Sequence, residues 1–313
     1  MMMEASSRLD DSLLSLAWSL WAELGVSSVV QAHAECYVDP EALLIFTASL
    51  ADVDPRLRDE SLDCALTLAP FLWTSRLKTL LLNADEQQQR AFGSYAATFN
   101  GASTTHVTLP LADAERAPPL RRSGKSRSAE RPEAPSQLAI RCRAIFGVGA
   151  RADALAVMLC SPNQGWLAAE LALHVGLPKR AMATVLQDFA RGGLMRATAV
   201  GNRLRYDLVQ RKGLELIVGV RPRWKPAWAL ILPCLIRMRA IVARTQGKET
   251  MTALIESQKA IVAFLDDMAA LGLHGRAPDY RSWSAVVDWT ESIASGLAGA
   301  RSEWFGADIR SAA

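Results

Sequence analysis

The chain has 313 residues, of which 50% are hydrophobic and 21% are charged, a composition typical of packed globular proteins with two or three domains. Its five cysteines are odd in number, far apart and never arranged as CxxC, which argues against a disulfide framework or a zinc site and predicts a reducing, cytoplasmic setting. The formal net charge of +3 is close to balanced, but the charges are unevenly distributed along the chain.

Residues 1–113 predict an acidic helical domain, because they hold 6 Lys and Arg against 15 Asp and Glu, a balance of −9. Apolar residues recur at helical spacing around Trp18 and Trp21, and acids stand where a signal peptide would carry basic residues, so this helix is expected to stay attached. Asp39-Pro40 and Asp54-Pro55 each combine an N-cap oxygen with a proline suited to the first helical turn. Further helices are therefore expected over residues 40–51, 54–68 and 74–82.

Residues 114–137 predict a flexible basic linker. They are dense in Pro, Ser and Arg and almost lack large apolar side chains, so they bury too little surface to offset the entropy of ordering. They hold 6 basic against 3 acidic residues. We interpret the segment as a tether, with added non-specific phosphate contacts as the alternative.

Residues 138–212 contain most of the excess positive charge, with 11 Lys and Arg against 4 Asp and Glu, a balance of +7. Two helices are expected before Cys160, then a short helix over residues 166–174, a glycine-containing turn over 175–177, and another helix opened by Pro178. Helix, short turn and helix form the helix-turn-helix layout. On charge alone, a nucleic-acid contact and a solvated basic face are alternatives of similar weight.

The helix after Pro178 is predicted to bury Met182, Val185, Leu186 and Phe189 and to present a polar face to the major groove. On that polar face, which also carries Asp188, the side chains expected to contact bases or phosphates are Lys179, Arg180, Thr184 and Gln187. For each of them the alternative is a surface group that contacts nothing.

A β-hairpin is predicted next, because residues 194–199 and 204–209 alternate in the manner of strands around the turn pair Gly201-Asn202. The hairpin side chains expected to follow the phosphates or enter the minor groove are Arg196, Asn202, Arg203 and Arg205.

The run GLPKRAMATVLQDFARGGLMRATAVGNRLRYDL, residues 176–208, resembles the recognition helix and wing of winged helix-turn-helix regulators of the ArsR and MarR type. With the helices before this run, residues 138–212, the resemblance covers about a quarter of the chain. This chain differs from those short single-domain proteins by its long helical flanks. It implies a transcription regulator that binds double-stranded DNA, with two-fold symmetry as the usual state of such readers.

Residues 213–313 are expected to be helical again, with helices over 227–243, 249–271 and 283–297, and they hold 12 basic against 10 acidic residues, a balance of +2. The apolar run 226–236 is shorter than the roughly 20 residues needed to cross a bilayer, so no membrane partner is expected. We assign this region to dimerisation or to sensing of a signal.

Together these patterns predict a mainly α fold: a helical N-terminal domain, a central winged helix-turn-helix with a small β-hairpin, and a helical C-terminal region. The predicted function is a cytoplasmic, dimeric DNA-binding regulator, with a protein partner for the acidic N-terminal domain. The alternative is a protein-interaction adaptor that uses the winged helix as a structural module.

No catalytic residue, metal or cofactor is predicted. The four histidines lie in separate segments and none is paired with another ligand at metal-binding spacing. Scattered carboxylates of the N-terminal region are the only support for an enzyme, and their spacing fits helix surfaces and helix starts.

Overall fold

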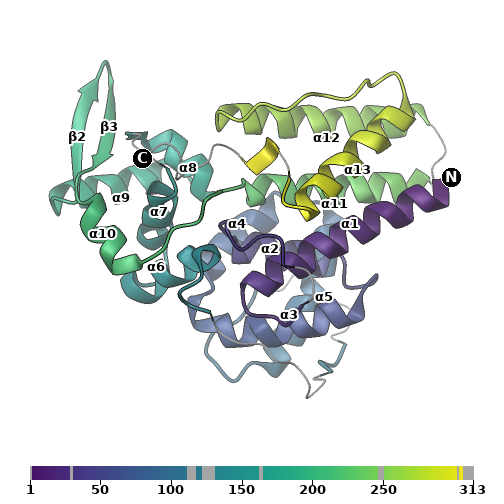
Figure 1. The fold of residues 1–313 in the computed structure, drawn as a ribbon, viewed down its shortest axis with the longest axis horizontal. Helices are drawn as coiled ribbons and strands as arrows, with labels where there is room; N and C mark the ends of the chain where they lie inside the picture. The colour runs from purple at the N-terminus through teal and green to yellow at the C-terminus, as the bar shows by residue number, and fades with distance from the viewer. Residues whose placement is uncertain are drawn as a thin grey trace.

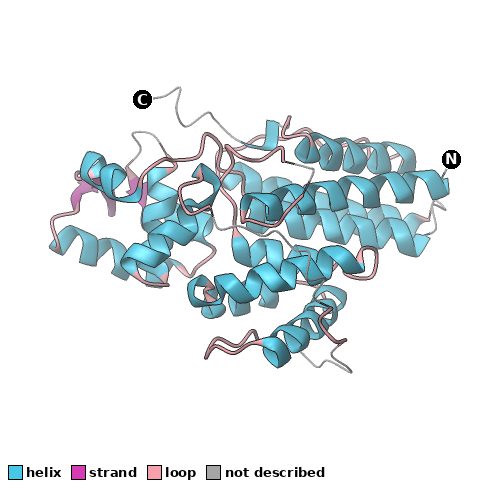
Figure 2. Ribbon diagram, turned by 60° about the horizontal axis from the view of Figure 1, so that its bottom comes forward, coloured by secondary structure: helices cyan, strands magenta, loops and turns pink. Residues whose placement is uncertain are grey.

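The computed structural model describes residues 2–28, 31–110, 118–121, 131–161, 165–245, 250–301 and 303–305. Within these ranges the chain is mainly helical and contains one small three-stranded antiparallel sheet, which confirms the predicted fold class at this coarse level. The strands lie at one end of the molecule, and helices fill the rest (Figure 2). Among the helices in these ranges, none combines the length and the apolar character that a bilayer crossing requires.

Helices from both ends of the described chain share one hydrophobic core, and we call this unit the body. They are α1 (Met2–Glu23), α2 (Pro40–Ala48), α3 (Pro55–Leu68), α4 (Thr74–Leu82), α5 (Glu86–Ala102), α11 (Trp228–Thr245), α12 (Met251–Ala270) and α13 (Trp283–Ala298), with short 3-10 turns at Ala69–Phe71 and Glu303–Phe305. Helix α1 packs on α13, and α11 packs on α2 and α12 (Figure 1). The acidic N-terminal segment and the C-terminal segment therefore fold against each other.

The helix starts of the body show which local signals the sequence carries. Asp39 Oδ1 accepts from the Ala42 amide at 3.1 Å, and Asp54 Oδ1 accepts from the Leu57 amide at 3.1 Å, so the two predicted Asp-Pro starts are confirmed. Helix α5 is absent from the predicted helices, although Asp85 and Gln88 form a reciprocal capping box at its start.

The middle of the chain forms a second unit with its own core, and we call residues 138–218 the central module. Its elements are α6 (Leu138–Phe146), α7 (Ala150–Leu159), β1 (Trp166–Leu167), α8 (Ala168–Val175), α9 (Lys179–Arg191), β2 (Met195–Val200), β3 (Arg203–Leu208) and α10 (Arg211–Val218). The strand order is β1-β3-β2, with every pair antiparallel.

The two predicted strands of the hairpin are each displaced by one residue, and the predicted start of one helix is wrong. The helix expected from residue 166 begins at Ala168, because Trp166 and Leu167 pair with Tyr206 and Arg205 as the short strand β1. That pairing satisfies backbone groups through β3 and places the Trp166 side chain in the core.

The end of the expected linker packs against the body. Residues 114–117 and 122–130 lie outside the described residues, whereas Ser136 and Gln137 are buried. Gln137 Nε2 donates to the Glu23 carbonyl at 3.0 Å, which ties the start of the central module to the end of α1.

A buried cluster of five charged side chains joins the two units. The body supplies Asp39, Glu41 and Arg76, and the central module supplies Arg143 and Asp153. Arg143 Nη1 lies 2.7 Å from Glu41 Oε1, and its Nη2 lies 2.7 Å from Asp153 Oδ2. Arg76 Nη2 lies 2.6 Å from Asp39 Oδ2, and its Nη1 lies 2.9 Å from Glu41 Oε2.

Arg143 and Asp39 of this cluster keep their charges in spite of burial. Burial would lower the pKa of Arg143, but Asp153 and Glu41 outweigh it and hold that pKa well above its ordinary value. Burial would raise the pKa of Asp39, but Arg76 holds it below its usual range. Each guanidinium thus bridges two carboxylates, the paired geometry that buried charges require.

Candidate nucleic-acid interface

The turn between α8 and α9 sets the angle between these two helices of the central module. Gly176 has φ 75° and ψ 41°, a left-handed conformation that favours glycine, and its amide donates to the Ala172 carbonyl at 2.9 Å. The Leu177 amide donates to the same carbonyl at 2.9 Å. Pro178 follows in an extended conformation, and α9 begins at Lys179.

Helix α9 is strongly two-sided. Its apolar face, formed by Met182, Val185, Leu186 and Phe189, is buried in the core of the central module. The four predicted contact residues of this helix all lie on its exposed side, namely Lys179, Arg180, Thr184 and Gln187. The Thr184 hydroxyl donates to the Arg180 carbonyl at 3.2 Å, so only its lone pairs remain for an outside donor.

The β2–β3 hairpin extends away from the core at the end of the molecule opposite the start of α1 (Figure 1). Met195 and Tyr206 anchor its base in the core, and Gly201, with φ 61°, forms the turn at its tip together with Asn202. Beyond the base, the hairpin is exposed on both faces. The four predicted hairpin contacts, Arg196, Asn202, Arg203 and Arg205, are all exposed.

Three arginines that contribute to the +7 balance are used inside the protein. Arg143 belongs to the buried cluster, and Arg141 Nε donates to the Val218 carbonyl at 2.7 Å. Arg211 Nη2 donates to the Met158 and Ser161 carbonyls at 2.8 and 2.6 Å. The charge available to a partner is therefore smaller than the sequence count indicates.

Two further cations are paired through one acid of α9. Asp188 Oδ2 lies 2.8 Å from Arg151 Nη2, and its Oδ1 lies 3.6 Å from Arg191 Nη1. Arg205 Nε lies 3.8 Å from Asp207 Oδ1, a weak exposed contact. By contrast, four exposed cations of α9 and the hairpin make no ion pair with any described residue, namely Lys179, Arg180, Arg196 and Arg203.

A serine–histidine pair lies in the interior of the body. Ser19 Oγ lies 2.7 Å from His33 Nδ1, and His33 Nε2 lies 2.8 Å from the Leu297 carbonyl. Both side chains are buried, and burial lowers the pKa of His33 to about 4. The pair connects α1 to the end of α13, and its spacing of 14 residues gave no sequence signal.

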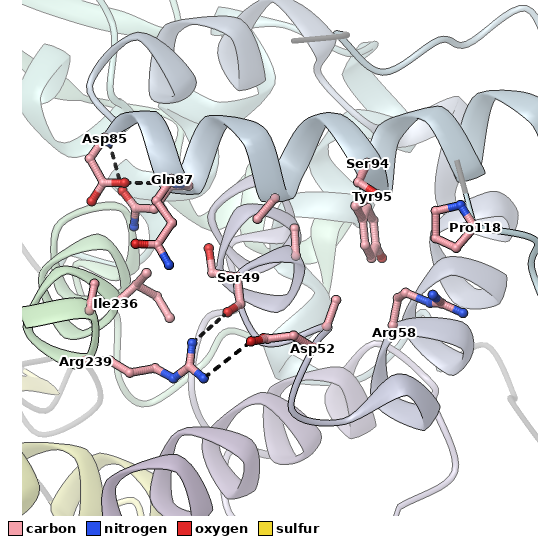
Figure 3. A pocket seen from close by; sticks show the side chains of 15 residues that line it. Ser49, Asp52, Arg58, Asp85, Gln87, Ser94, Tyr95, Pro118, Ile236 and Arg239 are labelled. Carbon is pink, nitrogen blue, oxygen red and sulfur yellow. Dashed lines mark hydrogen bonds and ion pairs between the residues drawn. The ribbon is translucent and has the colours of Figure 1, made fainter. Parts of the chain in front are cut away.

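Metal-binding clusters and a cavity in the body were the remaining candidates for a functional site. In the described part of the chain, no cluster of three or more His, Cys, Asp or Glu side chains is arranged to hold a metal ion. A cavity of about 310 Å³ lies between α2, α5 and α11 (Figure 3). Its arginines already have partners: Arg239 Nε lies 2.6 Å from Asp10 Oδ1, and Arg58 Nη2 lies 2.7 Å from Asp59 Oδ1.

The chain has no match among protein-family models, curated proteins or solved structures.

Proposed function

We propose that the central module is a winged helix-turn-helix and that the chain is a transcription regulator that binds double-stranded DNA. In this proposal α9 enters the major groove, and the β2–β3 hairpin follows the neighbouring phosphates. The observation that carries it is the set of exposed cations on α9 and the hairpin that form no ion pair with any described residue, namely Lys179, Arg180, Arg196 and Arg203. When such a cation neutralises a phosphate, counterions condensed on the DNA are released, and this release contributes a large part of the affinity.

The direct test is fluorescence anisotropy of the purified full chain with random duplex DNA at several salt concentrations. Binding that weakens steeply as salt rises supports the proposal, because each neutralised phosphate adds about 0.9 to the slope of log K against log salt. No binding at low salt would overturn it and favour the protein-interaction adaptor. Two chains per duplex would support the proposed dimer.

The hairpin contribution has its own test. The double variant Arg203→Ala/Arg205→Ala is expected to bind all duplexes more weakly and to reduce the salt slope by about 2, since two phosphate contacts are lost. The matched control is Arg90→Ala, which removes an exposed arginine of α5 that pairs with Glu86. An unchanged slope in the double variant would contradict the assignment of the hairpin.

The α9 contribution differs in kind. Changing Lys179, Arg180 or Gln187 to Ala is expected to alter sequence preference more than overall affinity, because a good contact to a base edge discriminates by about 1–3 kcal/mol. Binding-site selection from a random duplex library measures this preference. If the selected sequence were the same for the three variants and for the unmodified chain, α9 would not be the element that reads bases.

A further inference from the structure

A cavity of about 540 Å³ lies where the body meets the turn before α9. Its walls come from α2, α4 and α5, from α11 and α12, and from the α8–α9 turn at Gly176, Leu177 and Pro178. The volume falls within the range of pockets that hold small organic molecules. A molecule bound there would contact the body and the turn at the same time.

The floor of this cavity is apolar, and two alanines in its wall leave the space that forms it. Phe46, Leu232 and Phe264 are buried around it, while Ala42 and Ala172 leave space that larger side chains would fill. Preformed apolar walls favour a lipophilic ligand, because they offer it many dispersion contacts.

The cavity is also lined by a cation that has no ion pair with any described residue. Arg237 of α11 lines the cavity, is half-buried, and makes no hydrogen bond or ion pair with any described residue. Asn83 and Asp267 also line it, and both are more exposed than Arg237. A half-buried guanidinium gains most from a carboxylate, which accepts two parallel hydrogen bonds from it.

Helix α11 carries a proline beside the cavity. Pro233 has no amide hydrogen, so the Ala229 carbonyl lacks the donor that a regular helix would provide four residues later. Both residues line the cavity. The wall therefore combines an apolar surface with a small number of polar groups, which is the usual character of a ligand site.

We propose that this cavity binds a small lipophilic carboxylate whose carboxyl group pairs with Arg237, and that its occupancy changes the DNA affinity of α9. The second half of this statement rests on the proposed function. The first half, binding in the cavity, does not.

The proposed coupling between the cavity and α9 rests on the contacts of the α8–α9 turn. Arg76 of α4 donates from Nε to the Val175 carbonyl at 2.8 Å, at the end of α8. A Cβ placed on Gly176 would lie 3.6 Å from Leu80 Cδ2, so α4 is in contact with the turn. Leu177 and Pro178 line the cavity directly, and α9 begins at the next residue. A ligand between α4 and this turn therefore acts at the point that sets the position of α9.

Isothermal titration calorimetry of the full chain with 2-naphthoate tests the binding step. We expect saturable binding to the unmodified chain. Arg237→Gln should weaken the binding about 10-fold or more, because the charge-assisted pair with the carboxylate is lost. Asp267→Asn should strengthen it, because Asp267 carries the same negative charge as the ligand. The neutral analogue 2-naphthamide should bind more weakly than the carboxylate. No binding of 2-naphthoate, or equal binding of the amide, would overturn the proposal.

A steric variant locates the ligand. Ala263 lines the cavity from α12 but is exposed, so Ala263→Phe can fill the opening without disturbing the core. We expect it to abolish naphthoate binding, whereas Ala269→Phe, an exposed alanine of α12 that does not line the cavity, should leave it intact. Equal binding by both variants would place the ligand elsewhere and overturn the assignment.

Anisotropy with duplex DNA, with and without saturating 2-naphthoate, tests the coupling. In the unmodified chain we expect 2-naphthoate to change the DNA affinity by about 5-fold or more, which is the lower end of ordinary coupling between two sites. In Ala263→Phe we expect 2-naphthoate to leave the DNA affinity unchanged. The same DNA affinity with and without bound 2-naphthoate would overturn the coupling. Naphthoate binding by a chain that does not bind DNA would leave the cavity site standing and refute the proposed function alone.

Discussion

Replacing Arg143 with Ala is expected to lower the free energy of unfolding by about 3–5 kcal/mol, the usual cost of removing one partner from a buried ion pair. Arg143 bridges Glu41 and Asp153, with contacts of 2.7 Å to each. After the substitution Glu41 keeps Arg76, but the nearest remaining cation for Asp153 is Arg76 Nε at 4.0 Å. The buried carboxylate of Asp153 thus loses its two hydrogen bonds of 2.7 Å and keeps the longer contact to Arg76. Urea unfolding followed by circular dichroism measures the loss.

Two comparisons separate this effect from the simple loss of an arginine. Arg151→Ala removes an exposed pair with Asp188 and should change the unfolding free energy by less than about 1 kcal/mol. The double variant Arg143→Met/Asp153→Leu should recover part of the loss, because the carboxylate of Asp153 is then removed as well. A loss below about 1 kcal/mol for Arg143→Ala would show that the cluster contributes little to stability.

The elements of the central module could be predicted because their signals are local. The spacing of Met182, Val185, Leu186 and Phe189 defines a helix with one buried face, and Gly201-Asn202 marks a two-residue hairpin turn. Such signals require only neighbouring residues. The exposed positions of α9 and the hairpin follow from the same periodicity.

The role of each charge could not be predicted, because it depends on partners that are distant in sequence. Glu41 and Arg143 are 102 positions apart, and nothing in either neighbourhood indicates that they meet. The sequence count therefore treated Arg143, Arg141 and Arg211 as available to DNA, although the fold uses all three internally. Asp188, which pairs with Arg151 and Arg191, reduces the available charge further.

The shared core of the body could not be predicted either, because it also depends on contacts between residues that are distant in sequence. Helices of the two chain ends each show an apolar face, but a face does not identify its partner. Helix α5 is a different case, because the capping box of Asp85 and Gln88 at its start is a local signal that the sequence does carry. The cavity beside the α8–α9 turn arises only when these segments are brought together, and no local pattern could indicate it.

Acidification is expected to destabilise the protein through His33. Burial lowers the pKa of His33 to about 4 from its usual value of 6.5, partly offset by the hydrogen bond to the Leu297 carbonyl. As pH falls from 6.5 to 4, the unfolded chain takes up a proton that the folded chain does not, so the free energy of unfolding decreases. The difference of the two pKa values corresponds to about 3 kcal/mol across this range.

Urea unfolding at several pH values measures this linkage. In His33→Gln the decrease between pH 6.5 and 4 should be smaller by about 3 kcal/mol, because the titrating group is gone. His174, whose pKa burial lowers to about 3, acts in the same direction, so some dependence on pH will remain. His106 is exposed, and His106→Gln is the matched control. Equal pH dependence in His33→Gln and the unmodified chain would mean that His33 gains a proton within the fold, which the hydrogen bond from Ser19 to its Nδ1 opposes.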